Sequence, residues 1–246
     1  MKFQYIKTYV VNEYLFVNYV SYGSIQALAK MNSLTPDKFK STSPKYEVEI
    51  LVYYKGKKVE AKGIDTDQFG YGPAMRSELR KKFPSKPGLK VLDVGTGFGK
   101  NIQLLNDSLP GDRQIWSIDP SEEALANAGK IVKEKEIHDV VLAKGNAESH
   151  PLDKNFFDMA ISSLVMHHMT DVRAGIAGML QSLQRGGLLV ISDWAPPAHK
   201  LPFTQLHREE DFVPFSRVLQ FLNDMNTNPK GVDFNKWYLF TATRQL

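Results

Sequence analysis

Three glycines spaced two residues apart are the first feature of this sequence that could do chemistry. In VLDVGTGFGKN, residues 91–101, alternating apolar residues surround Asp93 and are followed by Gly95, Gly97 and Gly99. Where such a run leads into a helix, glycines let the backbone turn sharply and approach a ligand closely. We therefore expect a ligand site at the carboxyl end of this strand. A glycine-rich turn with a purely structural role is the alternative.

Two later runs end in side chains suited to a nucleoside. Asp119 closes QIWSID, 24 residues after Gly95, and its carboxylate can accept hydrogen bonds from both ribose hydroxyls. An Asp followed by Pro120 also suits a simple helix entry. After the next run, the amide of Asn146 can both accept from and donate to an adenine ring, and Ala147 adds a backbone N–H. Together the three strand ends predict a nucleoside site.

A histidine pair follows the fourth apolar run, in LVMHHM. An imidazole of His167 or His168 could take a proton from an oxygen, a nitrogen or an activated carbon at neutral pH, and we prefer His167 for this role. The alternative is that the pair caps the segment ahead of the next helix or packs beneath it. An adjacent pair supplies too few ligands for a metal ion, and spacing offers no third, so we expect no metal site.

The candidate site residues lie in a region where strand and helix patterns alternate. Five short apolar runs between residues 65 and 200 are separated by stretches of helical character, which predicts a parallel sheet with right-handed crossovers. The runs are LKVLDVG, QIWSID, DVVLAKG, FDMAISSL and GGLLVISDW, and the expected helices are 73–83, 100–108, 121–134 and 170–184.

The two ends of the chain lack the regular alternation of strand and helix patterns. Residues 1–64 contain runs rich in aromatic and β-branched residues, which predict two hairpins, with a short helix at 24–32 and a polar loop after it. Near the C-terminus we expect a helix over 206–225, interrupted near Pro214, and a last strand within 236–244 that joins the sheet edge. The predicted domains are therefore a β-rich annex, 1–64, and a larger domain, 65–246.

Composition excludes several functions. The chain has 246 residues, a net charge of +4 and no cysteine, so disulfides, thiolate zinc sites and a cysteine nucleophile are ruled out. Its basic residues are scattered, which is weak evidence for a nucleic-acid partner. Charged residues interrupt the N-terminal apolar stretch and no segment suits a bilayer, so we expect a cytoplasmic protein without a membrane partner.

The motifs together resemble the class I S-adenosylmethionine-dependent methyltransferases, particularly those of the ubiquinone/menaquinone type. VLDVGTGFGKN, IDPSEEAL, KGNAESHPLDKNFFDMAISSLVMHH and LQRGGLLVISDW carry this resemblance in the family's order and spacing. The resemblance implies a Rossmann-like, doubly wound α/β fold with a mostly parallel seven-stranded sheet, S-adenosyl-L-methionine as cofactor and a small-molecule methyl acceptor. The sequence departs from the family at Asn146, where an acid is usual.

The resemblance also implies roles for individual residues. Asp93 would support the glycine loop, Asp119 would hold the ribose, and the strand end at 162–163 would pass beside the sulfonium. Tyr71 and Arg76 lie ahead of the first strand, just outside and inside the expected helix, where they could cover the methionine end. The candidate cofactor residues are Tyr71, Arg76, Asp93, Gly95, Thr96, Gly97, Asp119, Pro120, Asn146, Ala147, Ser162 and Ser163.

Three other functions stay open. The lysines and tyrosines of the N-terminal hairpins could recognise RNA or a protein as the methyl acceptor, although they equally describe an exposed hairpin or a homodimer surface. A non-catalytic cofactor-binding subunit would keep the fold without the chemistry. A nicotinamide-dependent oxidoreductase would also use Asp119, but Gly99 falls two residues after Gly97 where that fingerprint requires three.

Overall fold

The computed structural model describes residues 3–11, 14–22, 47–54, 57–59, 71–148, 153–200 and 209–245. The chain divides into two compact units, Met1–Pro73 with His199–Glu209, and Ala74–Ala198 with Glu210–Leu246. In the first unit four antiparallel strands lie in the order β1-β2-β3-β4. They are β1 (Phe3–Val11), β2 (Tyr14–Tyr22), β3 (Glu47–Tyr54) and β4 (Lys57–Val59). The helix expected at 24–32 and the loop after it lie outside the described residues.

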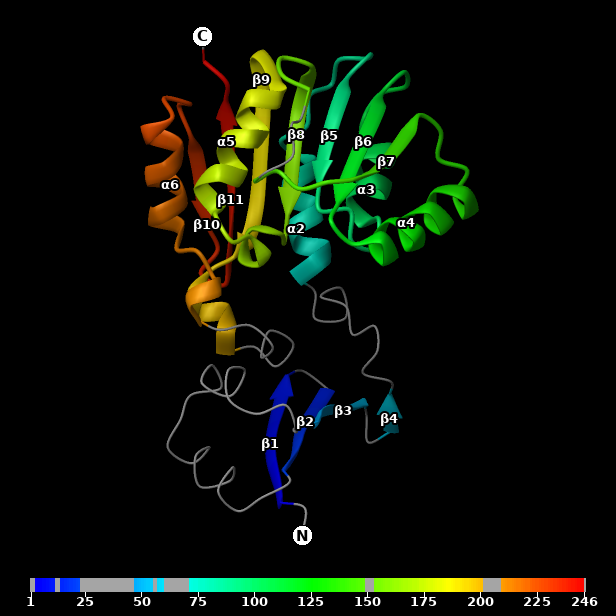
Figure 1. Ribbon diagram of the computed structural model, residues 1–246, viewed down its shortest axis with the longest axis vertical. Helices are drawn as coiled ribbons and strands as arrows, with labels where there is room; N and C mark the ends of the chain where they lie inside the picture. Colours follow the sequence, from blue (N-terminus) through cyan, green and yellow to red (C-terminus); the bar gives the residue numbers. More distant parts are fainter. Residues whose placement is uncertain are drawn as a thin grey trace. The chain divides into compact units, whose positions relative to one another are not determined.

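The second unit is built on a seven-stranded sheet in the order β10-β11-β9-β8-β5-β6-β7 (Figure 1). β11 is antiparallel to both of its neighbours, and the other pairs are parallel. The predicted doubly wound, mostly parallel sheet is therefore confirmed. The strands are β5 (Lys90–Val94), β6 (Gln114–Asp119), β7 (Val140–Lys144), β8 (Phe157–Ser163), β9 (Leu183–Trp194), β10 (Lys230–Asp233) and β11 (Trp237–Thr243).

The helices begin where the sequence supplies caps. The hydroxyl of Ser121 accepts a hydrogen bond from the Ala124 N–H, and the carboxylate of Asp171 accepts one from the Ala174 N–H. The α-helices are α2 (Tyr71–Arg80), α3 (Lys100–Ser108), α4 (Glu122–Glu134), α5 (Val172–Ser182) and α6 (Phe215–Asp224). Short 3-10 turns are η3 (Met166–His168), η4 (Pro196–Lys200) and η6 (Glu209–Asp211). Tyr71 was expected just outside its helix, but it is the first residue of α2.

Helices cover both faces of the sheet, and the direction in which the chain winds reverses within it. Residues of α3 and α4 pack on β7 through Ile102 and Ala128, whereas α5 and α6 form the main core with β8, β9 and β11. The chain thus winds one way from β5 through β7 and the other way from β8 onward. At such a switch point, loops from neighbouring strands diverge and leave a crevice beyond the carboxyl ends of the strands. Here the switch point lies between β5 and β8.

The C-terminal strand does not lie at the edge of the sheet, so that expectation was wrong. β11 lies between β9 and β10, and most of its residues are buried. Its nearly continuous apolar run, WYLFTAT, suits a strand covered on both faces. The edge is instead β10, whose sequence KGVD is fully exposed and lacks an apolar pattern that could have revealed it. Across the described ranges, no helix has the length and apolar character needed to cross a membrane.

Candidate active site

The glycine loop lies at the carboxyl end of β5, and two of its glycines serve different purposes. The N–H groups of Gly95 and Thr96 donate to the carbonyl of Ile118, at 2.8 and 3.1 Å. Gly95 has φ +86°, and a Cβ there would lie 2.2 Å from Val165 Cγ2. Gly97 has φ +46°, and no described atom lies within 4 Å of where its Cβ would be. Gly95 therefore allows close packing against the segment after β8, while Gly97 leaves open space in front of the loop.

The carboxylate of Asp119 joins this loop to the next strand. Its Oδ2 accepts a hydrogen bond from the Gly97 N–H at 3.0 Å, and its Oδ1 accepts one from the Ser121 N–H at 2.8 Å. Asp119 is half-buried, and exposed Pro120 separates it from the start of α4. A carboxylate oxygen that accepts one hydrogen bond keeps capacity for a second. The structure thus brings together Asp119 and the glycine loop, as the sequence predicts.

Asp93 lies fully buried beneath the loop. The Asn101 amide donates to its Oδ1 at 2.9 Å, and the Ser117 hydroxyl donates to its Oδ2 at 2.6 Å. Thr96 and Ser117 share a further hydroxyl contact of 2.7 Å, so Thr96 is tied to the same cluster. Burial raises the pKa of Asp93 to about 6, against the lowering effect of its two side-chain hydrogen bonds. This cluster supports the loop from below and connects β5, β6 and α3.

Replacing Asp93 with asparagine is expected to change how stability depends on pH. Because burial raises the pKa of Asp93 from its ordinary value of 3.8 to about 6, folding favours the protonated carboxyl. The stability from this preference is fully present below about pH 3.8 and is lost as the pH rises through about 6; it amounts to about 3 kcal/mol. Urea unfolding of both proteins between pH 4 and 7 should show this fall in the wild type and a smaller one in Asp93→Asn. Equal slopes would contradict the expectation.

The loop after β7 is held firmly against α5. The Asn146 Oδ1 accepts a hydrogen bond from the Glu148 N–H at 3.0 Å, and the Glu148 carboxylate accepts one from the Asp171 N–H at 2.6 Å. The carbonyl of buried Ala147 approaches Gly178 so closely that a Cβ there would lie 2.0 Å from the Ala147 oxygen. The expected adenine contacts of Asn146 and Ala147 stay predictions, with one hydrogen bond to the Asn146 oxygen already made within the loop.

The end of β8 carries two serines in different environments. Ser162 is buried, and its Oγ has no hydrogen-bond partner among the described residues. A buried polar atom left in this way is unusual and fits a place beside a polar ligand. The Ser163 hydroxyl instead lies 2.8 Å from that of Ser192 on β9. In α2, Tyr71 and Arg76 are both half-buried, and their expected role at the methionine end stays a prediction.

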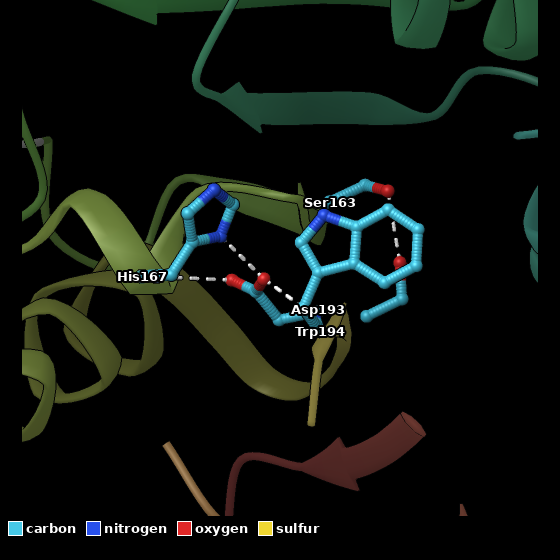
Figure 2. Close-up of polar contacts among 5 residues, drawn as sticks. Ser163, His167, Asp193 and Trp194 are labelled. Carbon is cyan, nitrogen blue, oxygen red and sulfur yellow. Dashed lines mark hydrogen bonds and ion pairs between the residues drawn. The ribbon is translucent and has the colours of Figure 1, made fainter. Parts of the chain in front are cut away.

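The histidine pair forms η3, and one member contacts an acid at the end of β9. His167 Nδ1 lies 2.6 Å from Asp193 Oδ1, and the His167 backbone N–H donates to Asp193 Oδ2 at 3.2 Å (Figure 2). Both side chains are buried, and the ring of Phe212 stacks on His167 with centroids 5.7 Å apart. Sequence reasoning did not assign a role to Asp193. Its only signal was an acid at the end of the apolar run LLVISDW.

The two imidazoles have pKa values that shift in opposite directions. For His167, burial lowers the pKa, but the charge and hydrogen bond of Asp193 and the charge of Asp211 outweigh it, so the net shift is upward. For His168, burial and the positive charge of protonated His167 lower the pKa. The two histidines are therefore chemically distinct. In the part of the chain that the structure describes, no three acidic or histidine side chains gather as metal ligands.

The fold and the site agree with the resemblance seen in the sequence. The strand order with its one antiparallel strand, the glycine loop and the acid at the neighbouring strand tip are what a likeness to class I S-adenosylmethionine-dependent methyltransferases implies. Residues 92–191 match the family model described as a methyltransferase domain. Over these residues the second unit of this chain is similar to a methyltransferase domain.

Relatives in sequence carry methyltransferase names. The ubiquinone/menaquinone biosynthesis C-methyltransferase UbiE of Shewanella frigidimarina is 26% identical over 182 residues, 73% of this chain and 66% of the relative. UbiE of Shewanella sediminis is 31% identical over 117 residues, 47% of this chain and 46% of the relative. The chain thus spans between about half and two thirds of the length of these relatives.

Solved structures show the same fold. A SAM-dependent methyltransferase from Aquifex aeolicus has a TM-score of 0.59 at 21% identity, covering 69% of this chain and 89% of that one. The Haemonchus contortus phosphoethanolamine N-methyltransferase 2, solved with S-adenosylhomocysteine, has a TM-score of 0.61 at 14% identity. The match covers 72% of this chain and 53% of that one. The [4+2]-cyclase SpnF also matches, with a TM-score of 0.60 at 16% identity. This match covers 72% of this chain and 82% of that one. Since the name of that protein gives a different reaction, the reaction of this chain must be argued from its site.

Proposed function

We propose that this protein is an S-adenosylmethionine-dependent methyltransferase that acts on a small molecule. The observation that carries the proposal is the hydrogen bond from the Gly97 N–H to Asp119, beside open space at Gly97 and at the sheet's switch point. This arrangement brings together a backbone loop and an acid that we propose binds the ribose. The names of the sequence relatives support methyl transfer, and the C-methyltransferases among them support a small acceptor.

The residues present fit the cofactor. Asp119 would hold the ribose hydroxyls, the loop after β7 the adenine, and the 95–97 loop with the buried Ser162 hydroxyl the methionine and sulfonium end. When bound, S-adenosylmethionine supplies a methyl carbon on a positively charged sulfur. The protein's part is to align the acceptor with that carbon and to exclude water; such alignment is worth about 7–11 kcal/mol in favourable cases. We also propose that the protein acts in the cytoplasm.

Calorimetric titration with S-adenosylhomocysteine tests the proposal. We expect the wild type to bind it, and Asp119→Ala to bind it about 10- to 100-fold more weakly, because hydrogen bonds to a charged group contribute about 1.5–3 kcal/mol. Asp233→Ala is a matched control: its carboxylate also accepts a hydrogen bond from an N–H two residues later, that of Asn235, at 2.7 Å, but it lies on the edge strand. NADH in place of S-adenosylhomocysteine tests the oxidoreductase alternative.

The outcomes separate the alternatives clearly. Failure of the wild type to bind S-adenosylhomocysteine, or equal weakening by Asp119→Ala and Asp233→Ala, would contradict the proposal. Tight binding of NADH alone would favour the oxidoreductase. Binding of S-adenosylhomocysteine followed by label transfer from methyl-labelled S-adenosylmethionine only to RNA or protein would keep the enzyme class and overturn the small-molecule acceptor.

A further inference from the structure

We infer that Asp193 is a positioning residue that holds His167 in the tautomer with the proton on Nδ1, so that Nε2 accepts a proton from the methyl acceptor. The inference rests on the proposed function and deepens it, because it names the kind of acceptor atom. That atom must carry a proton that it loses as it gains the methyl group. Hydroxyl, phenol, activated carbon and neutral N–H acceptors meet this requirement, whereas a tertiary amine does not.

The contacts of Asp193 indicate where the ring proton of His167 lies. Both of its oxygens accept backbone N–H groups, Oδ1 from Trp194 at 2.6 Å and Oδ2 from His167 at 3.2 Å. Both oxygens thus act as hydrogen-bond acceptors. An ionised carboxylate is an acceptor only, so the short 2.6 Å contact with His167 requires the proton to lie on Nδ1. The second ring nitrogen, Nε2, then carries the lone pair that can take a proton.

Two contacts between Asp193 and His167 hold the ring in place. Because one carboxylate binds both the backbone and the ring of His167, the turn η3 and the imidazole are oriented together (Figure 2). Stacking of Phe212 on the ring further restricts its rotation. The side chains of the pair are 5% and 1% exposed, which keeps their interaction out of bulk water. An electrostatic interaction is stronger in such a place than at the surface.

The pair also lies at the correct edge of the sheet. Asp193 is the penultimate residue of β9, and η3 begins three residues after the end of β8, so both lie at the carboxyl ends of parallel strands. Val165, two residues before His167, packs against Gly95 of the glycine loop closely enough to exclude a Cβ there. The histidine is thus tied by a short segment to the loop that would hold the methionine end of the cofactor.

The proton and electron balance of the step follows directly. A bond forms between the acceptor atom and the methyl carbon, and the carbon–sulfur bond breaks with its electron pair staying on sulfur. The acceptor's proton passes to Nε2 of His167, which becomes an imidazolium ion beside the Asp193 carboxylate. The proton is later released to water. General-base assistance of this kind contributes about 10²- to 10⁴-fold to rate.

The charged and titratable groups around His167 set the pH dependence. Asp193 and Asp211 favour its protonated form, and burial opposes it. The pKa of neighbouring His168 is lowered by burial, although the charge of Asp119 acts to raise it. Tyr238, buried beside Asp193 in the register of β9 and β11, stays neutral because burial and that carboxylate raise its pKa. Removing the negative charge of Asp193 should therefore lower the pKa of His167. Activity, which needs neutral Nε2, would then rise at lower pH in the variant but reach a lower maximum.

The test uses nitrogen-15 NMR of the imidazoles in the full chain, with and without S-adenosylhomocysteine. His167→Gln assigns the signals of His167, and exposed His138→Gln is the control. We expect the wild type to show the Nδ1–H tautomer, and Asp193→Asn to lose this preference and titrate at lower pH while binding S-adenosylhomocysteine within twofold of the wild type. Asp193→Glu, which restores the charge, should recover the lowered tautomer preference in part. If Asp193→Asn does not fold, the tautomer of His167 in the wild type and in Asp193→Glu still tests the inference.

A kinetic arm tests the acceptor. A panel of phenols, hydroquinones, 1,3-dicarbonyls and tertiary amines is offered with methyl-labelled S-adenosylmethionine, and we expect transfer only to proton-bearing acceptors. For these, Asp193→Asn should lower kcat about 100-fold with KM within twofold. A wild-type Nε2–H tautomer, an unchanged tautomer in Asp193→Asn, or transfer only to tertiary amines would overturn the inference. If the wild type fails to bind S-adenosylhomocysteine, the proposed function itself fails, and the titration shows this separately.

Discussion

Replacing Gly97 with leucine is expected to abolish binding of S-adenosylmethionine and S-adenosylhomocysteine, with a loss of at least about 100-fold in affinity. No described atom lies within 4 Å of the position that a Cβ on Gly97 would occupy, so the side chain would project into space that we assign to the cofactor. Sterically displacing a ligand and its hydrogen bonds from a loop loses several interactions at once, each worth about 1 kcal/mol or more. Isothermal titration of the purified variant measures the effect.

Gly88→Leu is the matched control for this variant. Gly88 also has a positive φ, +71°, and a Cβ there would likewise have no described atom within 4 Å. Both substitutions therefore cost about 1–2 kcal/mol of backbone strain, and their effects on stability should be similar. Only Gly88→Leu should leave cofactor affinity within about twofold of the wild type. Equal affinities of the two variants would show that the space in front of Gly97 is not the cofactor site.

Replacing Gly178 with alanine is expected to lower both stability and cofactor affinity. The new Cβ would lie 2.0 Å from the Ala147 carbonyl oxygen and 3.1 Å from its carbon, so the backbone of the loop after β7 must move away from α5. Overpacking of this kind costs about 1–3 kcal/mol, which exceeds the gain of about 1 kcal/mol from the better helix propensity of alanine. The displaced loop is the one that we expect to contact adenine, so affinity should fall about 10-fold.

A second helical glycine gives the opposite result and so serves as the control. In α4, a Cβ on Gly129 would lie 3.7 Å from Leu142 Cδ1, an ordinary contact distance. Gly129→Ala should therefore raise the melting temperature through helix propensity, by about 2–4 °C per kcal/mol for a chain of this size. Calorimetric melting with and without S-adenosylhomocysteine measures both variants. A rise in melting temperature for Gly178→Ala as well would contradict the close contact between α5 and the Ala147 carbonyl.

Local sequence patterns predicted several strands and helices of the second unit, and they predicted that the glycine loop and Asp119 lie together. The apolar runs, the Ser121 cap and the glycine-rich turn predicted β5, β6, α3 and α4 to within about one or two residues. The closeness of Asp119 to the glycine loop followed as well, because the carboxyl ends of adjacent parallel strands share one edge of a sheet. These features depend on backbone sterics and on interactions between residues near in the chain, which a sequence displays directly.

Only the tertiary structure decided the rest. The pairing of His167 with Asp193 joins residues 26 positions apart and exists because β8 and β9 lie side by side in one register. The placement of β11 inside the sheet depends on β10, whose four residues, KGVD, give no strand pattern. Likewise, the need for glycine at 178 depends on how closely α5 approaches a loop about 30 residues earlier. Such contacts depend on strand order and on packing distances between elements, and neither is encoded by periodicity along the chain.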